Sequence, residues 1–465
     1  MSVTIGRQLP SLPVLSVPLA VIGGLAIRFG APLEPAGATM LAITAFCIVL
    51  WIGNLVPPAY TGILCLGIVG IAFSMDLALV GFQSPATWLI AFGLVMGEAT
   101  RRSGLAEWTN QWIVDRCMPV SPAANPHQTY RRLLVGLSIG AFLLTLIVPV
   151  AIVRVLVLAP ILLEAGERFD SKRAGLGLFL GPLFVTHYGT AAVLTGGSPN
   201  IVVVGILESI TGVTITWTEW FALMFPVMGV GRLLVIVAVA SLLYRPEPDL
   251  QISNVENEVR AMTGTERRML VFLLAGVAVW ASDFLHGLHP VYGALFVVVL
   301  SFLPGIGVVE FEGTLEDVDF SILFFIAAVF AIGDGLARTG VADRLAEGLL
   351  TIVPENAPLV VVLGIVLLIM IGLMFVVEEL AAASVVTPIF VSFATDAGIP
   401  VTPIVLTEAM AFGLHVFPYQ SAVLVVMLAY SIAEPRELIR MAAACTLAIV
   451  LLLVPIQLAI FGWIF

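Results

Sequence analysis

A polar interruption inside an apolar stretch carries residue types that can bind an ion or a small anion. It reads THYGTAAVLTGGSPN over residues 186–200 and is followed directly by apolar residues. Glycine and proline stop a helix and free backbone amides and carbonyls, which bind an anion or a desolvated cation. Ser198 and Asn200 add neutral oxygens suited to Na⁺ and donors suited to a carboxylate or sulfate. We assign Thr195, Gly197, Ser198 and Asn200 to a substrate site and Gly196 to a coupling-ion site. A kink satisfied by neighbouring helices is the alternative.

A shorter interruption repeats this pattern later in the chain. It reads HVFPYQS over residues 415–421, again with an amide side chain just past a proline. Two such breaks at matching positions favour a binding site over two unrelated kinks. The second break adds Pro418, Gln420 and Ser421 to the candidate substrate site. His187 and His415 lie beside the two breaks, where either an imidazole titrates and couples binding to pH, or both rings are neutral core residues.

Ionisable side chains occur in two further apolar stretches, each interrupted midway. Arg154 lies five residues past Pro149 in the first stretch, and Glu378 and Glu379 interrupt the second. Ionisable groups inside a membrane are functional candidates, and a guanidinium can hold two oxygens of a carboxylate or sulfate. We therefore assign Arg154 to the substrate site and the two glutamates to the coupling-ion site, where one of them binds Na⁺ or carries a proton. A Na⁺ site would use Glu378 and Asn200. The alternative is an ion pair between Arg154 and one glutamate.

Motifs for catalysis are absent from the sequence. It contains no GxSxG or HExxH pattern and no phosphate-binding glycine loop with its lysine, which excludes the common hydrolases and ATP-driven pumps. The chain is therefore not expected to be an enzyme, and it needs no cofactor beyond Na⁺ or H⁺ as the coupling ion. Arg232, inside another apolar run, is interpreted as a helix-packing residue.

The composition indicates that long apolar helices position these residues. Of 465 residues, 60% are apolar and 11% charged, against roughly 45–50% and about 25% in soluble domains. At about 20 residues per crossing, the apolar runs supply roughly eleven transmembrane helices, so we predict an all-α polytopic membrane protein. The net charge of −11 and the lack of a basic tract argue against nucleic acid as a partner.

An internal repeat organises these helices. The segment Gly97–Glu107 is matched by Gly333–Asp343, 236 residues later. Each copy precedes an interrupted stretch that we interpret as a re-entrant hairpin, so the second copy begins on the opposite face of the membrane, as in inverted-repeat secondary transporters. The predicted parts are residues 1–36 as an N-terminal helix, 37–243 as the first repeat with hairpin 133–163, 244–268 as a cytoplasmic linker, and 269–465 as the second repeat with hairpin 359–393. Most of the 20 basic residues then lie in the cytoplasm, together with the N-terminus.

The chain resembles a known family in these elements. The Gly/Ser-Pro-Asn element at residues 196–200, the two copies of the glycine-bounded acidic motif and the proline-terminated hairpins Val148–Pro160 and Val377–Pro388 resemble the divalent anion:sodium symporters. This is the DASS or solute carrier 13 family of the ion transporter superfamily, and the resemblance covers about residues 37–465. It implies a homodimer whose protomers have a scaffold domain and a transport domain, and which moves dicarboxylates, citrate or sulfate with Na⁺ by an elevator-like motion. The family's Ser-Asn-Thr hairpin signature is replaced here by Val150-Ala151-Ile152 and Glu378-Glu379-Leu380, and this correspondence places Ala151 at the coupling-ion site.

These observations predict a secondary active transporter of small divalent anions, of the dicarboxylate or sulfate class, coupled to Na⁺ or H⁺. The alternatives are a Na⁺/H⁺ or oxyanion exchanger of the same superfamily and a membrane subunit that does not transport. The expected partners are a small anionic solute, the lipid bilayer and a second copy of the chain. The expected location is a bacterial inner membrane.

Overall fold

The computed structural model describes residues 12–53, 56–117, 125–148, 151–252, 260–354 and 356–465. Within these ranges the regular elements are helices, and the only strand-like pairing is an isolated bridge between Phe169 and Ile252. The predicted all-α class is therefore confirmed.

The first half of the chain is built from helices of very different lengths. They are α1 (Leu12–Gly30), α2 (Pro35–Gly53), α3 (Pro58–Ala72), α4 (Met75–Ala78), α5 (Val80–Gln83), α6 (Pro85–Arg102), α7 (Leu105–Cys117), α8 (Pro126–Ile147), α9 (Ala151–Glu167), α10 (Lys172–Tyr188), α11 (Ser198–Thr211), α12 (Trp217–Met224) and α13 (Arg232–Leu243). Two 3₁₀ turns, η1 (Gly189–Ala192) and η2 (Leu194–Gly196), separate α10 from α11, and a π-helical segment, η3 (Phe225–Gly231), joins α12 to α13.

The second half follows a linker that ends where α14 begins. Its helices are α14 (Gly264–Ala281), α15 (Asp283–His286), α16 (Val291–Phe302), α17 (Phe311–Glu316), α18 (Ile322–Arg338), α19 (Val341–Ile352), α20 (Leu359–Met374), α21 (Glu379–Asp396), α22 (Val401–Ala411), α23 (Ala422–Ala429), α24 (Pro435–Ala448) and α25 (Val454–Ile464). A 3₁₀ turn, η4 (Pro418–Gln420), precedes α23, and a π-helical segment, η5 (Ile449–Leu453), joins α24 to α25.

Several helices have the length and composition of membrane spans. In the described part of the chain five qualify by both criteria, namely Pro35–Gly53, Pro126–Leu146, Trp217–Leu243, Glu379–Asp396 and Pro435–Ile464. The pair α18 and α19 qualifies jointly but is bent by 74°, and shorter apolar helices such as α3, α11 and α20 accompany these segments. Together they form a multi-pass membrane protein.

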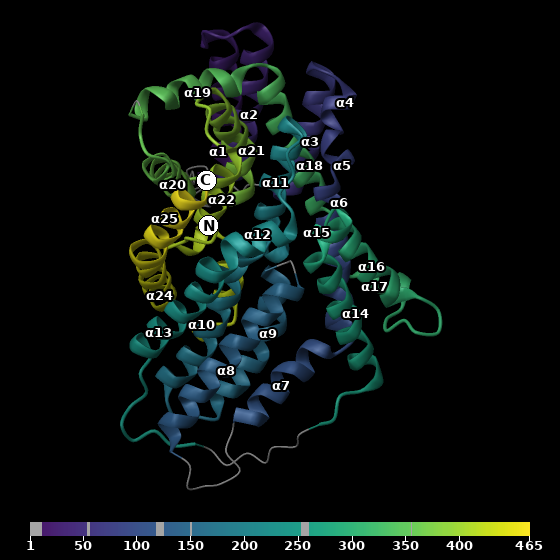
Figure 1. Ribbon diagram of the computed structural model, residues 1–465, viewed down its shortest axis with the longest axis vertical. Coiled ribbons are helices and arrows are strands. Elements are labelled where there is room, and N and C mark those ends of the chain that lie inside the picture. The colour runs from purple at the N-terminus through teal and green to yellow at the C-terminus, as the bar shows by residue number, and fades with distance from the viewer. Residues whose placement is uncertain (1–11, 54–55, 118–124, 149–150, 253–259, 355) are drawn as a thin grey trace, which may run out of the picture.

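Both predicted interruptions occur, and each separates two packed helices. The first lies between α8 and α9, although Pro149 itself is outside the described residues, and the second covers residues 375–378 between α20 and α21. The helices extend beyond the predicted hairpins 133–163 and 359–393, to 126–167 and 359–396. In Figure 1 α8 and α9 lie in the lower half of the molecule, whereas α20 and α21 lie in the upper half, the opposite placement expected of inverted copies.

The two copies of the repeated motif fold alike at opposite ends of the molecule. Arg102 lies 2.9 Å from Glu98 at the end of α6, and Arg338 lies 2.6 Å from Asp334 at the end of α18. Each pair joins residues four apart on a helix, where side chains face each other. The helices that follow, α7 and α19, lie at the lower and upper ends in Figure 1.

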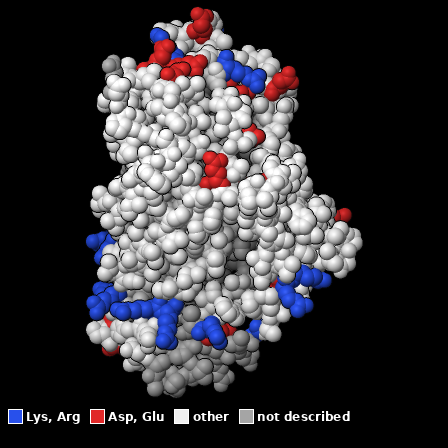
Figure 2. Space-filling view, viewed as in Figure 1, with Lys and Arg blue, Asp and Glu red and all other residues white. Residues whose placement is uncertain are grey.

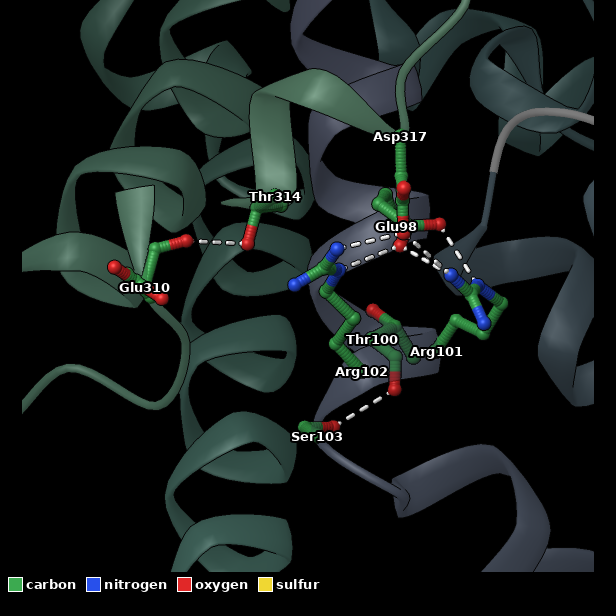
Figure 3. Close-up of polar contacts among 8 residues, drawn as sticks. All are labelled: Glu98, Thr100, Arg101, Arg102, Ser103, Glu310, Thr314 and Asp317. Carbon is green, nitrogen blue, oxygen red and sulfur yellow. Dashed lines mark hydrogen bonds and ion pairs between the residues drawn. The ribbon is translucent and has the colours of Figure 1, made fainter. Parts of the chain in front are cut away.

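The first copy makes an additional contact with the other half. Figure 3 shows Arg101 and Arg102 on either side of the carboxylates of Glu98 and of Asp317, which follows α17, and the two arginines reach Asp317 at 3.1 and 2.6 Å. On the face seen in Figure 2, Lys and Arg side chains gather mainly near this lower end, and acidic side chains mainly near the upper end. This asymmetry is the one that marks a cytoplasmic side in membrane proteins.

Candidate functional site

The two polar interruptions predicted from the sequence meet inside the molecule. The Nε2 atom of His187, near the end of α10, lies 3.2 Å from the Nδ1 atom of His415, which follows α22. A Cβ at Gly413 would lie 3.9 Å from the Cα of Tyr188, so the backbones are also close. Both histidines are buried. Residues far apart in the sequence therefore form one centre between the halves.

Side-chain hydrogen bonds stabilise the conformation of the first break. The amide nitrogen of Asn200 donates to the carbonyls of Thr190 at 2.8 Å and Val193 at 3.1 Å. The Trp217 indole donates to the Thr195 hydroxyl at 3.0 Å. The two bonds of Asn200 satisfy backbone carbonyls that the interrupted helix leaves free. Asn200 and Thr195, both predicted substrate ligands, thus bind the protein itself in this conformation.

The amino-terminal end of α11 closes this break. Gly197 has an extended backbone at the start of the helix, which has no side-chain cap, and Ser198 is partly exposed. Backbone N–H groups at such an end are suited to an anion. The predicted ligands Gly197 and Ser198 therefore lie where an anion could bind to the start of α11.

The second break repeats this construction. The Gln420 side-chain oxygen accepts from the N–H groups of Val416 at 2.8 Å and Phe417 at 2.6 Å, and its nitrogen donates to the Met374 carbonyl at 2.8 Å. Met374 ends α20, so Gln420 also ties the break to the second hairpin. Two further predicted ligands have local positions: Pro418 begins the 3₁₀ turn, and Ser421 caps α23 through the N–H of Val423.

Arg154 links the first hairpin to the first break through hydrogen bonds. Its side chain is completely buried, and its Nε donates to the Thr186 hydroxyl at 2.8 Å. Its terminal nitrogens donate to the carbonyls of Thr186 at 3.0 Å, Gly196 at 2.9 Å and Val148 at 2.5 Å. Among the described residues no carboxylate lies within ion-pair distance of Arg154, so the alternative pairing with Glu378 or Glu379 is not observed.

Arg232 belongs to the same centre, although the sequence suggested only packing. Its side chain is completely buried and donates to the carbonyls of Tyr188 at 2.8 Å and Met410 at 2.6 Å. Tyr188 is the last residue of the interrupted helix α10, and Met410 is the last but one of α22. The rule that ionisable residues inside a membrane are functional applies to Arg232 as it does to Arg154, and that signal could have identified it. The π-helical segment directly before it is a second signal, since such segments are frequent at functional sites.

The two candidate coupling glutamates have different surroundings. Glu378 caps α21 by accepting from the N–H groups of Leu380 at 2.9 Å and Ala381 at 3.3 Å. Glu379 points to the breaks, because its carboxylate lies 3.9 Å from Nε2 of His415. Its side chain keeps 22% of its surface exposed.

A cation site at the predicted positions is not visible in this conformation. Asn200 and Glu378, the predicted Na⁺ ligands, are each engaged with backbone groups of their own segments. In the part of the chain that the structure describes, three or more His, Cys, Asp or Glu side chains do not converge as a metal site. Ala151 begins α9 and is partly buried.

Two cavities lie away from this centre. One of about 200 Å³ borders the first break through Leu194 and Ile201 and is lined on its polar side by Glu208, Asp283 and His289. The other, about 520 Å³, is an apolar groove between α7, α8 and α14. Neither of these two cavities is lined by Arg154, Arg232 or the histidine pair.

Comparisons with known proteins agree with a transport protein. The family model described as citrate transporter, CitMHS, matches residues 37–413. A membrane protein of Cupriavidus necator is 24% identical over 359 residues, which cover 71% of this chain and 68% of the relative. The L-tartrate/succinate antiporter of Escherichia coli strain K12 is 21% identical over 370 residues, which cover 75% of this chain and 72% of that protein.

A solved structure shares the architecture. The YdaH transporter of Alcanivorax borkumensis superposes with a TM-score of 0.55 at 14% identity, and the match covers 97% of both chains. At this identity the likeness concerns the fold and not the transported solute.

Proposed function

The chain belongs to the citrate transporter family, CitMHS, and we propose that it is a secondary active transporter of small carboxylate anions with two or three carboxyl groups. The family match confirms the expected resemblance to the divalent anion transporters, and it confirms a transporter rather than an enzyme. Tartrate, succinate and citrate are the first candidate solutes, because the matching family and relatives carry these names.

The observation that carries this proposal is the pair of buried arginines at the centre. Among the described residues, neither Arg154 nor Arg232 has a carboxylate within ion-pair distance, and both bind neutral oxygens. A buried charge without a counter-charge is unfavourable in a membrane. A carboxylate substrate supplies that counter-charge, whereas a cationic substrate would be repelled.

Transport requires that the centre opens alternately to the two sides. We propose that the hairpins α8–α9 and α20–α21 move with the two breaks as a transport domain in an elevator-like motion, within a homodimer in a bacterial inner membrane. The Lys and Arg side chains that gather near the lower end in Figure 2 support a cytoplasmic location for that end, and we propose a cytoplasmic N-terminus. A co-transported cation, Na⁺ or H⁺, offsets the charge of the solute, with Glu378, Glu379, Gly196 and Ala151 around its path.

The test is exchange of labelled solute by the purified protein in liposomes. Liposomes loaded with unlabelled succinate, tartrate or citrate are placed in labelled solute, and the wild-type protein is expected to exchange at least one of them. Arg154→Gln is expected to reduce the rate at least tenfold, whereas Arg268→Gln, an exposed arginine on α14, leaves it unchanged. Repeating net uptake with a Na⁺ gradient alone and a pH gradient alone identifies the coupling ion.

The outcomes separate the competing functions. Folded wild-type protein that exchanges none of the three solutes refutes the proposal. If it instead moves Na⁺ against H⁺ without any carboxylate, the exchanger of the same superfamily is correct, and a folded protein with no flux at all points to a subunit that does not transport.

A further inference from the structure

The guanidinium of Arg232 binds the ends of both interrupted helices. Tyr188 is the last residue of α10 and Met410 is the last but one of α22, and Arg232 donates to both carbonyls. The carbonyls at the end of a helix lack partners within that helix. One side chain from α13 therefore satisfies two such ends, one from each half of the chain.

The electrostatic consequence concerns the charge at the centre. The carboxyl-terminal end of a helix carries roughly half a negative charge. Two such ends that meet at the breaks amount to about one negative charge, which repels an anion. The single positive charge of Arg232 offsets this sum where it arises, at distances of 2.8 and 2.6 Å.

This offset leaves the charge of Arg154 available. Arg154 and Arg232 bind on either side of His187, one to Thr186 and the other to Tyr188. Without Arg232 the nearby helix ends would compensate Arg154, and the centre would be close to neutral. With Arg232 in place the helix ends no longer compensate Arg154, so its charge remains available to a substrate, beside the Glu379 carboxylate that lies 3.9 Å from His415.

A further feature of Arg232 points to a missing partner. Its Nε atom is buried and has no hydrogen-bond partner among the described residues. An unsatisfied buried donor on a charged group is more unfavourable than one on a neutral group. Such a donor is satisfied when an anionic oxygen approaches it, a charge-assisted bond stronger than one to a neutral acceptor.

We propose that Arg232 determines the anion selectivity of the central site. It neutralises the carboxyl-terminal ends of α10 and α22 and offers Nε–H to the bound solute, so that the site prefers a dianion to a monoanion. This inference rests on the proposed function and adds to it the residue that sets the preferred charge of the substrate.

The experiment compares two solutes that differ in charge but hardly in size. Succinate is a dianion, and its monoamide, succinamate, is a monoanion of nearly the same shape. Exchange of each is measured in liposomes for the wild-type protein, Arg232→Met, Arg232→Lys and the surface control Arg268→Gln. Melting temperatures of the purified variants are measured in parallel.

The inference makes a specific expectation for each variant. Arg232→Met raises the KM for succinate at least tenfold and the KM for succinamate threefold or less. Arg232→Lys keeps a positive charge but cannot bind both carbonyls as a planar fork, so it retains the preference for succinate with a smaller rise in KM. Should Arg232→Met fail to fold, Arg232→Gln takes its place, because it also removes the charge but keeps an N–H donor for one carbonyl. A ratio of the two KM values shifted against succinate then supports the inference, and an unchanged ratio with a lowered melting temperature overturns it.

The results distinguish this inference from the proposed function. Equal rises in KM for both solutes, or an unchanged ratio in a folded Arg232→Met protein, overturn the role of Arg232 while exchange by the wild-type protein stands. A wild-type protein that exchanges neither solute refutes the transport function, and with it the selectivity assigned to Arg232.

Discussion

His187 and His415 lie 228 residues apart in the sequence, yet their rings meet with Nε2 of one 3.2 Å from Nδ1 of the other. The ring planes are 23° apart and the centroids are 5.4 Å apart. A neutral imidazole has one donor and one acceptor nitrogen, so this contact sets the tautomers of both rings together. It is also a direct polar link between the two halves of the chain.

Replacement of His415 tests this link. His415→Leu leaves the Nε2 atom of His187 buried without a partner, which costs about 1–3 kcal/mol, whereas Gln at the same position keeps a donor and an acceptor. The Leu variant is therefore expected to melt at a lower temperature than the Gln variant and to exchange solute more slowly. Thermal unfolding and exchange in liposomes measure both effects, with His286→Gln, exposed at the end of α15, as the control. Equal melting temperatures for the Leu and Gln variants would show that the contact between the two histidines does not contribute to the stability of the protein.

Gly196 is expected to tolerate no side chain. A Cβ there would lie 2.4 Å from the Thr190 carbonyl oxygen, which also accepts from Asn200. Gly196→Ala must therefore displace the first break and is expected to lower the melting temperature and abolish exchange. Gly364→Ala on α20 is the matched control, because nothing lies within 4 Å of its Cβ. The control should keep wild-type exchange and gain up to about 1 kcal/mol through the unfolded state. Wild-type exchange by Gly196→Ala would contradict the close approach.

The position of the breaks could be predicted because residue types that disfavour a helix gather there. Gly196, Gly197 and Pro199 cannot continue a helix inside an apolar stretch, and the acidic pair Glu378 and Glu379 ends another. The repeat was equally visible, since the ion pair of Glu98 recurs at a fixed spacing in the second half. Helix-breaking residues and repeated charge spacings of this kind can be recognised in a single sequence.

The partners of the arginines could not be predicted in the same way. Arg154 and Arg232 bind mainly backbone carbonyls, which every residue carries, so no residue type in the sequence marks Gly196 or Met410 as their acceptors. An ion pair of Arg154 with a glutamate, the alternative to its role as a substrate ligand, is not observed in this conformation, and Glu378 caps its own helix instead. Tertiary packing decides which carbonyls reach a buried guanidinium.

The ion pairs in Figure 3 predict a pH dependence of stability. The hydrogen bond from Arg102 holds the pKa of the Asp317 carboxyl below its ordinary value of 3.8. A lowered carboxyl pKa adds stability that is present above the ordinary value and is lost as the pH falls through the folded-state pKa. Asp317→Asn is therefore expected to lower the melting temperature by a small, constant amount from about pH 5 to about pH 8, and the difference should close below 3.8.

Melting curves of the two proteins across this range provide the check on Asp317. Glu312→Gln, exposed on α17, serves as the control and should follow the wild-type protein at every pH. A difference that does not shrink as the pH falls below the ordinary carboxyl pKa, or none at neutral pH, would be incompatible with the ion pair to Arg102.

Variants of Asn200 and Gln420, the amide side chains that follow the prolines of the two breaks, test whether these residues bind the solute or only position the breaks. Asn200 donates to two carbonyls, so Asn200→Asp places a carboxylate against two oxygens and is expected to destabilise the first break by roughly 2 kcal/mol or more. Gln420 mainly accepts, from two N–H groups, so Gln420→Glu keeps those bonds and loses only the one to Met374. We therefore expect a lower melting temperature without solute and a lower Vmax for Asn200→Asp, and a milder effect for Gln420→Glu. A raised KM with an unchanged melting temperature in Asn200→Asp would instead make Asn200 a direct ligand of the solute, since a ligand acts on binding and a positioning residue acts on the conformation that binds.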